Sequence, residues 1–193
     1  VDIDGVPKYL DYVERKGSYD DYYIVQEFID GRSLLDCIDE MNESGLVFAE
    51  RIVLDFANSM VQILFFLETQ YQPPIIHRDI KPDNIMVRSD GTLTLVDYDG
   101  MFVPAMKGQT SPTIGTKDFS HPLRTIDDFD ETIDDFALAS IALSLKAISL
   151  NPSLLNEYGA SDRLLFSAAD YLDLSKSKTM TALQGLLSDE EIK

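Results

Sequence analysis

The sequence predicts an α+β fold that begins with a short β-hairpin and continues as a mostly helical body. Two runs, at 8–14 and 22–29, are rich in aromatic and β-branched residues, which is typical of strands. Residues 49–70 repeat apolar side chains at helical spacing, and 136–150 form a nearly unbroken apolar run of helical length. With 193 residues, 45% of them hydrophobic, the chain is long and apolar enough to bury a core.

The chain is strongly acidic, with 16 Lys and Arg against 34 Asp and Glu and a formal net charge of −18. Nucleic acids and anionic membrane surfaces attract basic proteins, so neither is expected as a partner. The longest nearly apolar stretch is too short to cross a bilayer, which takes ~20 residues. A single cysteine, Cys37, cannot form a disulfide within the chain, which favours a reducing compartment and predicts a cytoplasmic protein.

The elements of the first half follow in chain order. The polar stretch 15–21 joins the two strands of the hairpin, and Asp30-Gly31 is predicted to end the second strand in a turn. A capping-box pattern at Ser33 predicts a short helix over 33–41. The long helix at 49–70 comes next, with one wide apolar face.

The second half alternates short strands, a loop and helices. Three short strands are predicted, at 75–76, 85–88 and 92–96. Residues 100–132 show no periodicity and many Gly, Pro, Ser and Thr, which predicts a long loop of the kind that is usually functional. Asn151-Pro152 is predicted to end the apolar helix, and two short helices are expected at 160–172 and 179–192.

The most informative residues lie in two neighbouring motifs. The first is Ile76-His77-Arg78-Asp79-Ile80-Lys81-Pro82-Asp83-Asn84, and Asp97-Tyr98-Asp99-Gly100 begins thirteen residues after its end. Together they resemble the H-R-D-x-K-P-x-N catalytic loop and a variant of the D-F-G motif of the eukaryotic-type serine/threonine protein kinase family. The D-Y-D-G variant is also similar to a bacterial branch of kinase-like proteins.

The residue types in these motifs suit phosphoryl transfer by their own chemistry. The reaction needs negative charge to be neutralised and an attacking oxygen to be held in line. Asn84 and Asp97 offer the amide and carboxylate oxygens that hard divalent cations prefer. Lys81 would place positive charge on the migrating phosphoryl group, and Asp79 would orient the substrate hydroxyl and accept its proton. Alone, each of Asp79, Asn84 and Asp97 would be read as a turn-capping residue, but the three in this pattern argue against that reading.

The resemblance implies a protein-kinase-like fold with a mostly helical C-terminal lobe and a remnant β-hairpin of the N-terminal lobe. Residues 1–29 would be the remnant of the small-lobe strands and the hinge, and 30–193 the large lobe. The large lobe would contain the catalytic loop 77–84, the metal motif 97–100, the activation segment 100–124, the central helix 133–150 and short C-terminal helices within 160–192.

The same resemblance assigns residues around the nucleotide. Gln26 takes the gatekeeper position, the backbone of Glu27 and Ile29 would bond to the adenine edge, and Met86 would pack under the ring. Without the resemblance, this stretch would be read as an ordinary buried strand.

Structural support for the site is expected from His77 and Arg78 within the loop and from Asp134. Asp134 would accept backbone N–H groups and hold His77 and Arg78 in a strained turn, and Tyr98 would stack on His77. Asp134 reads equally well as one more acid at a helix start, which favours the positive end of the helix dipole.

The sequence also departs from the family pattern. Neither a glycine-rich loop nor the small-lobe lysine precedes Tyr22, so the chain is expected to be truncated, with the missing lobe on a preceding polypeptide. Asp99 replaces the usual glycine of the metal motif. Leu123 replaces a glutamate that normally pairs with an arginine further along, which puts the anchoring of the activation segment in doubt.

The function implied is ATP-dependent phosphoryl transfer to serine or threonine of a protein substrate, with ATP and Mg²⁺, or Mn²⁺ in its place, as cofactors. The activity is expected of the parent protein, whereas this chain alone is expected to be inactive. One alternative is a pseudokinase-type module that binds a partner protein, which Asp99 and Leu123 favour. Another is a small-molecule kinase of related fold; the acidic surface suits a cationic substrate, and Lys81 argues against it.

Overall fold

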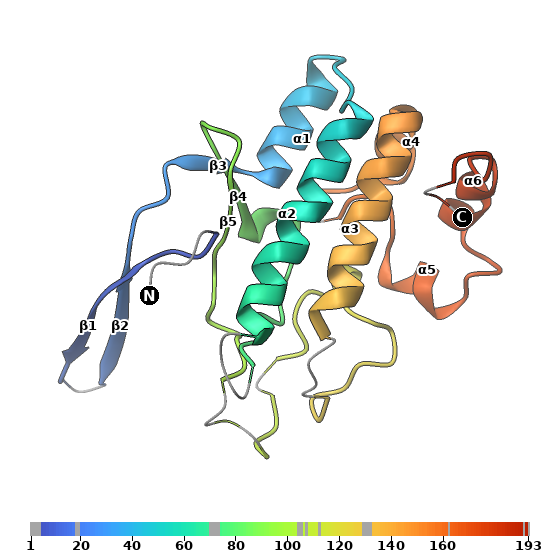
Figure 1. The fold of residues 1–193 in the computed structure, drawn as a ribbon. Helices are drawn as coiled ribbons and strands as arrows, with labels where there is room; N and C mark the ends of the chain where they lie inside the picture. Colours follow the sequence, from blue (N-terminus) through green and yellow to red (C-terminus); the bar gives the residue numbers. More distant parts are fainter. Residues whose placement is uncertain are drawn as a thin grey trace.

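The computed structural model describes residues 5–17, 20–69, 74–103, 106, 108–111, 113–128, 133–161, 163–190 and 192. A helical body carries the β1–β2 hairpin on one side, which confirms the α+β class (Figure 1). The elements in order are β1 (Tyr9–Arg15), β2 (Asp21–Gln26), β3 (Gly31–Ser33), α1 (Leu34–Glu43), α2 (Glu50–Thr69), the 3₁₀ helix η1 (Pro82–Asn84), β4 (Ile85–Arg88), β5 (Leu93–Leu95), the 3₁₀ helix η3 (Lys117–Phe119), α3 (Ile133–Leu150), α4 (Ser153–Tyr158), α5 (Ala168–Leu172) and α6 (Lys178–Gln184).

The core is organised around α2 and α3, which lie side by side in the middle of the body (Figure 1). α2 buries one residue every three or four positions: Val53, Phe56, Met60, Ile63 and Leu67. α3 is buried on most sides because it serves two clusters. Ile141 and Leu145 pack against α2, whereas Ala147 and Ile148 join the C-terminal helices. This double role explains why the sequence of α3 is apolar all round.

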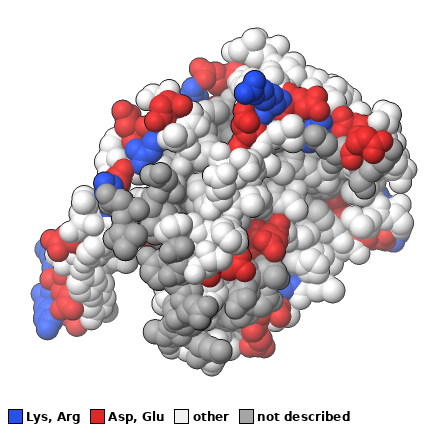
Figure 2. Space-filling view, viewed as in Figure 1, with Lys and Arg blue, Asp and Glu red and all other residues white. Residues whose placement is uncertain are grey.

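The outer face of α2 is also apolar, with Leu54, Val61 and Phe65 exposed. Within the described residues, α2 has the length and composition of a membrane span, a test that the core helix of a soluble protein passes equally well. Figure 2 shows an uncharged centre on this side of the molecule, with acidic side chains more frequent than basic ones around it.

A three-stranded antiparallel sheet, ordered β3-β4-β5, connects the hinge region to the site. β3 pairs Gly31 with Arg88 and Ser33 with Met86, so the turn predicted at Asp30-Gly31 is instead the start of a strand. A Cβ atom on Gly31 would lie 2.6 Å from the carbonyl oxygen of Val87, so a glycine is needed for this close approach. Ile85 on β4 is fully buried and anchors the end of the catalytic loop in the core.

The β1–β2 hairpin is confirmed, but every residue of its two strands is exposed. Two hydrogen bonds join its base to the body: the Leu95 N–H donates to the Gly5 carbonyl (2.8 Å), and Glu27 accepts from Arg88. The Glu27 N–H donates to the Lys8 carbonyl (2.9 Å), and the Lys8 N–H donates to Glu27 Oε2 (3.1 Å). The other carboxylate oxygen accepts a hydrogen bond from Arg88 at the end of β4 (2.8 Å).

The C-terminal region differs most from expectation. The predicted helix at 160–172 is wrong over 160–167, because Ala160 and Arg163 form an isolated β-bridge and the helix begins only at Ala168. The break predicted at Asn151-Pro152 is confirmed, since α3 ends at Leu150. The short helix α4 that follows was not predicted; Pro152 stands at its N-cap, where proline is tolerated because the first N–H groups of a helix have no partner. α6 ends at Gln184, before the predicted limit of 192.

A buried lysine on α3 forms ion pairs that hold the C-terminal region to the core. Lys146 on α3 is 4% exposed, and its ammonium group contacts the carboxylates of Glu50 at the start of α2 and Asp189 (3.2 Å) beyond α6. A buried charge needs such partners, because leaving an ion unpaired in the interior costs several kcal/mol, of the order of ~3–5.

Candidate active site

The catalytic loop 77–84 is held to α3 by one buried carboxylate. Asp134, in the first turn of α3, accepts the backbone N–H groups of His77 and Arg78, each at 2.7 Å. Arg78 has a φ of +75°, a strained conformation for a residue with a side chain. Of the two readings of Asp134, the geometry therefore supports the one in which it stabilises a strained loop.

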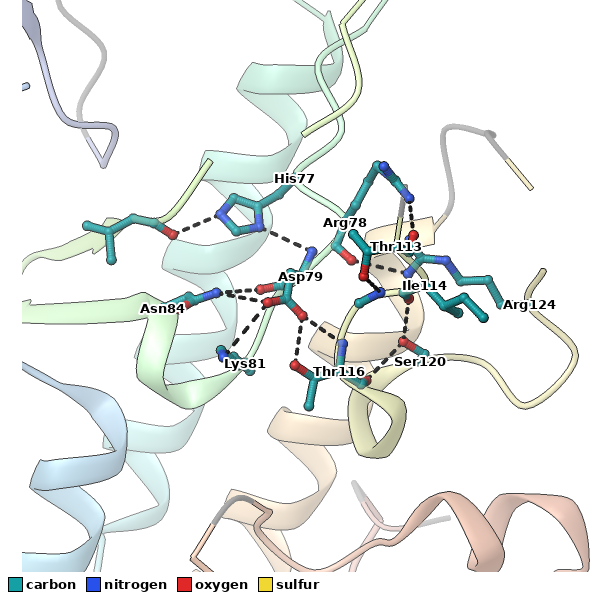
Figure 3. A network of polar contacts seen from close by, with 12 residues as sticks. His77, Arg78, Asp79, Lys81, Asn84, Thr113, Ile114, Thr116, Ser120 and Arg124 are labelled. Atoms are coloured by element: carbon teal, nitrogen blue, oxygen red, sulfur yellow. Dashed lines mark hydrogen bonds and ion pairs between the residues drawn. The ribbon is translucent and has the colours of Figure 1, made fainter. Parts of the chain in front are cut away.

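Asp79 lies at the centre of a polar network (Figure 3). Its Oδ1 accepts hydrogen bonds from the Thr116 N–H (2.8 Å) and hydroxyl (2.9 Å). Its Oδ2 lies 3.8 Å from Lys81 Nζ and 3.4 Å from Asn84 Nδ2. Asn84 Nδ2 also donates to the Asp79 carbonyl at 2.8 Å. The structure thus brings Asp79, Lys81 and Asn84 together, while Thr116 fixes the direction of the Asp79 carboxylate.

The backbone of Val96 joins the catalytic loop to the second motif. The Val96 N–H donates to the Asn84 carbonyl at 2.8 Å, and the Val96 carbonyl lies 3.0 Å from Nε2 of His77. Asp97 is the next residue, with a φ of +67° and an exposed side chain. These two bonds therefore place Asp97 beside Asn84 at the same edge of the body.

The His77 ring is a structural member of the site. It is fully buried and contacts the ring of Tyr98 edge-on, at 4.7 Å between centroids and 64° between planes, rather than in the expected stack. Burial lowers the pKa of His77, which favours the neutral ring. A neutral ring can donate from Nε2 to Val96 and accept the Asp79 N–H at Nδ1 (3.4 Å).

The donor set fits a divalent cation that is shared with phosphates. Because Asn84 Nδ2 is bonded to Asp79, the amide oxygen of Asn84 is the atom left to bind a cation. Among the described residues, no three His, Cys, Asp or Glu side chains form a metal cluster. With only Asn84 and Asp97 as oxygen ligands, the cation would need phosphate oxygens and water, which is how Mg²⁺ is usually held.

The residues assigned to adenine lie on the hairpin side of the body. Gln26, at the end of β2, shares a cavity of about 440 Å³ with Ile75 and Tyr98. Because the Glu27 N–H is bonded to Lys8, only the carbonyl of Glu27 can serve the adenine edge. Ile29 is buried and Met86 is half-buried on β4. The roles of these four residues stay predictions.

Several contacts of the site were not foreseen from the sequence. The Arg78 side chain donates to the Gly100 carbonyl (2.9 Å), the Thr113 carbonyl (2.7 Å) and the Ser111 hydroxyl, which ties segment 100–124 to the loop. Gly115 has a φ of +79°, and a Cβ atom there would lie 2.7 Å from the Arg78 carbonyl oxygen. The pair Gly115-Thr116 was the available signal, since glycine before a hydroxyl residue permits such a close approach.

Comparison with known families agrees with this geometry: residues 3–153 match the model of the protein kinase domain. The chain belongs to the protein kinase family. The match confirms the resemblance drawn from the two motifs. It begins ahead of the β1–β2 hairpin and ends three residues past α3.

Curated kinases of several organisms are similar to this kinase domain. Serine/threonine-protein kinase B of Synechocystis is 34% identical over 128 residues, which cover 61% of this chain and 21% of that protein. Serine/threonine-protein kinase pak-1 of Caenorhabditis elegans is 29% identical over 157 residues, 78% of this chain and 25% of that protein. The chain thus spans about a quarter or less of the length of these relatives.

Proposed function

We propose that this chain forms the catalytic large lobe of a serine/threonine protein kinase, which transfers the γ-phosphoryl group of ATP to a hydroxyl group of a protein. The arrangement of Asp79 carries the proposal. One oxygen of its carboxylate is fixed by Thr116, and the other faces Lys81 and Asn84. A residue that merely caps a turn has no need of a lysine and an amide converging on its free oxygen.

The residues take distinct parts in this reaction. Asp79 orients the acceptor hydroxyl and takes its proton as the oxygen bonds to phosphorus and the bond from phosphorus to the ADP oxygen breaks. Lys81 places positive charge beside the group in transfer. Asn84 and Asp97 hold Mg²⁺, or Mn²⁺ in its place, and Mg-ATP when bound supplies the phosphoryl group and neutralises its charge.

The acceptor is proposed to be serine or threonine of a protein. The names of the relatives support this class. Lys81 supports it as well, because the resemblance of the 77–84 motif implies a serine/threonine-type kinase when lysine stands at this position. A small-molecule acceptor remains the weaker alternative. We also propose a cytoplasmic location, which the free thiol of Cys37 supports.

We further propose that a further stretch of polypeptide packs on the β1–β2 hairpin and supplies the phosphate-binding part of the small lobe. The exposed apolar side chains on both faces of the β1–β2 hairpin support this, because a two-stranded sheet alone is marginally stable. Mg-ATP should then raise the melting temperature of this chain only when that polypeptide is supplied. A clear rise with the chain alone would contradict this part of the proposal.

A partner-binding module without activity is the second candidate. Leu123 is 76% exposed and offers no carboxylate to anchor the activation segment, and Asp99 adds a negative charge next to the metal motif. Binding of a partner protein without phosphate incorporation in the complete protein would favour this candidate.

The deciding experiment measures phosphate incorporation from labelled ATP by the complete protein. Asp79→Asn and Asp97→Asn should each abolish labelling of a protein substrate. Asp83→Asn is the matched control, because Asp83 lies in the same loop with its side chain exposed. Unchanged labelling in both site variants would reject the mechanism.

A further inference from the structure

Arg124 directly follows Leu123, the residue that replaces the glutamate by which the activation segment is usually anchored. Leu123, at the position of the expected glutamate, is 76% exposed. The following turn, in which the Arg124 N–H donates to the His121 carbonyl (2.9 Å), brings Arg124 back toward the body, where it is half-buried. The arginine therefore reaches the site from the end of segment 100–124.

The guanidinium group of Arg124 contacts the catalytic loop directly. Its Nη1 donates to the backbone carbonyl of Arg78 at 3.2 Å (Figure 3). The N–H of Arg78 is bonded on the other side to Asp134 at 2.7 Å. Arg78 is thus held through both its N–H and its C=O, and the peptide that carries this carbonyl leads into Asp79.

The charges around this contact agree with the geometry. Burial is the main cause that lowers the pKa of Arg78, and the positive charge of nearby Arg124 lowers it further. The negative charge of Asp134 raises the pKa of Arg78. Two guanidinium groups therefore share the surroundings of one buried carboxylate. Two residues after Arg124, the Ile126 carbonyl accepts a hydrogen bond from the Ser111 N–H (2.9 Å). This part of the chain therefore also holds Ser111, whose hydroxyl the Arg78 side chain contacts.

From these contacts we infer that Arg124 is a positioning residue, which fixes the 78–79 peptide and thereby the direction of Asp79. It does the work of the absent glutamate anchor by bonding the end of the activation segment to the catalytic loop itself. The effect on catalysis rests on the proposed kinase function, whereas the effect on the loop does not.

The test compares Arg124→Met with Arg163→Met in the full chain. Arg163 is a matched control, since it is also half-buried and donates to a backbone carbonyl, that of Tyr158 (3.3 Å), away from the site. Arg124→Met should speed hydrogen exchange at the His77 and Arg78 amides about fivefold or more relative to Arg163→Met, because a holding contact is lost. Equal exchange in the two variants would overturn the inference. Arg124→Ala, which also lacks a donor, replaces Arg124→Met if the latter does not fold.

Activity of the complete protein supplies the second readout. A misdirected base should lower kcat roughly 10- to 100-fold while the KM for ATP stays unchanged, and Arg124→Lys should recover part of the loss because lysine can still donate to the carbonyl. A normal kcat in Arg124→Met would overturn the positioning role. If the wild-type protein transfers no phosphate at all, the proposed function fails, and hydrogen exchange alone then decides whether Arg124 holds the loop.

Discussion

The catalytic loop and the β1–β2 hairpin are built in opposite ways. The polar groups of the loop are bonded to Asp134, Thr116 and Val96, and its apolar residues enter the core. The hairpin exposes every residue of both strands and joins the body through hydrogen bonds at its base. The helical body therefore holds the 77–84 loop through its own core, whereas the hairpin leaves its apolar side chains on the surface.

The largest effect should come from removing the carboxylate that holds the loop. Asp134→Ala leaves the amides of His77 and Arg78 buried without an acceptor, at about 1–3 kcal/mol of unfolding free energy for each. Asp135→Ala is the control, since Asp135 is exposed in the same helical turn. Urea unfolding should separate the two variants clearly, and equal midpoints would contradict the role given to Asp134.

A pair of isoleucines tests the difference between core and hairpin. Ile85→Ala, at a side chain with 0% exposure, should cost about 2–5 kcal/mol of unfolding free energy. Ile24→Ala, at 60% exposure, should change it by less than about 0.5 kcal/mol. A large loss for Ile24→Ala in equilibrium unfolding would mean that the hairpin is already packed in solution.

Alanine substitutions at two glycines distinguish the cost of backbone strain from the cost of steric crowding. Gly115 and Gly45 both have positive φ, but a Cβ atom meets the Arg78 carbonyl only at Gly115 and nothing within 4 Å at Gly45. Each alanine substitution should cost about 1–2 kcal/mol for the left-handed conformation. Gly115→Ala should add a further loss and displace the loop, which amide NMR shifts of the residues around Asp79 would detect. Identical losses at both positions would show that the loop can move freely there.

The smallest effect concerns the attachment of the hairpin. The hydrogen bond from Arg88, followed by that from Lys8, lowers the pKa of Glu27 below the ordinary 4.5. A carboxyl group with a lowered folded pKa stabilises the fold above its unfolded pKa and loses that contribution as pH falls through the folded value. The melting temperature of the wild type should therefore exceed that of Glu27→Gln at neutral pH, and the two melting temperatures should converge below about pH 4.5. A difference in melting temperature that stays constant as the pH falls would contradict the pairing of Glu27 with Arg88 and Lys8.

Elements that depend on local patterns were predicted well from the sequence. Apolar residues at regular spacing, or in an unbroken run, are a property of the segment itself. Such patterns were enough to predict the helices at 50–69 and 133–150 and the strand at 85–88. β3 was missed because three residues form a strand only through their pairing with β4. α4 was missed because proline ends a helix or begins one according to its position.

The candidate site shows the same difference between residues found from local motifs and contacts made across long stretches of sequence. Asp79, Lys81, Asn84 and Asp97 stand in two short motifs, so their types and order were sufficient to propose the chemistry. The contacts of Thr116 and Arg124 with the loop span 37 and 46 residues of sequence, and no local pattern reports such pairs. The side-chain orientation of Asp79 depends on these distant partners, which is why it required the structure.

Lys146 has a consequence for how this domain is delimited. The match to the kinase family stops at residue 153, yet a carboxylate at position 189 neutralises an ammonium group near the end of α3. A shorter version cut at the family boundary would remove that counter-charge along with the second apolar cluster. The folding unit is therefore larger than the region of family similarity, and the last forty residues belong to it as structural members.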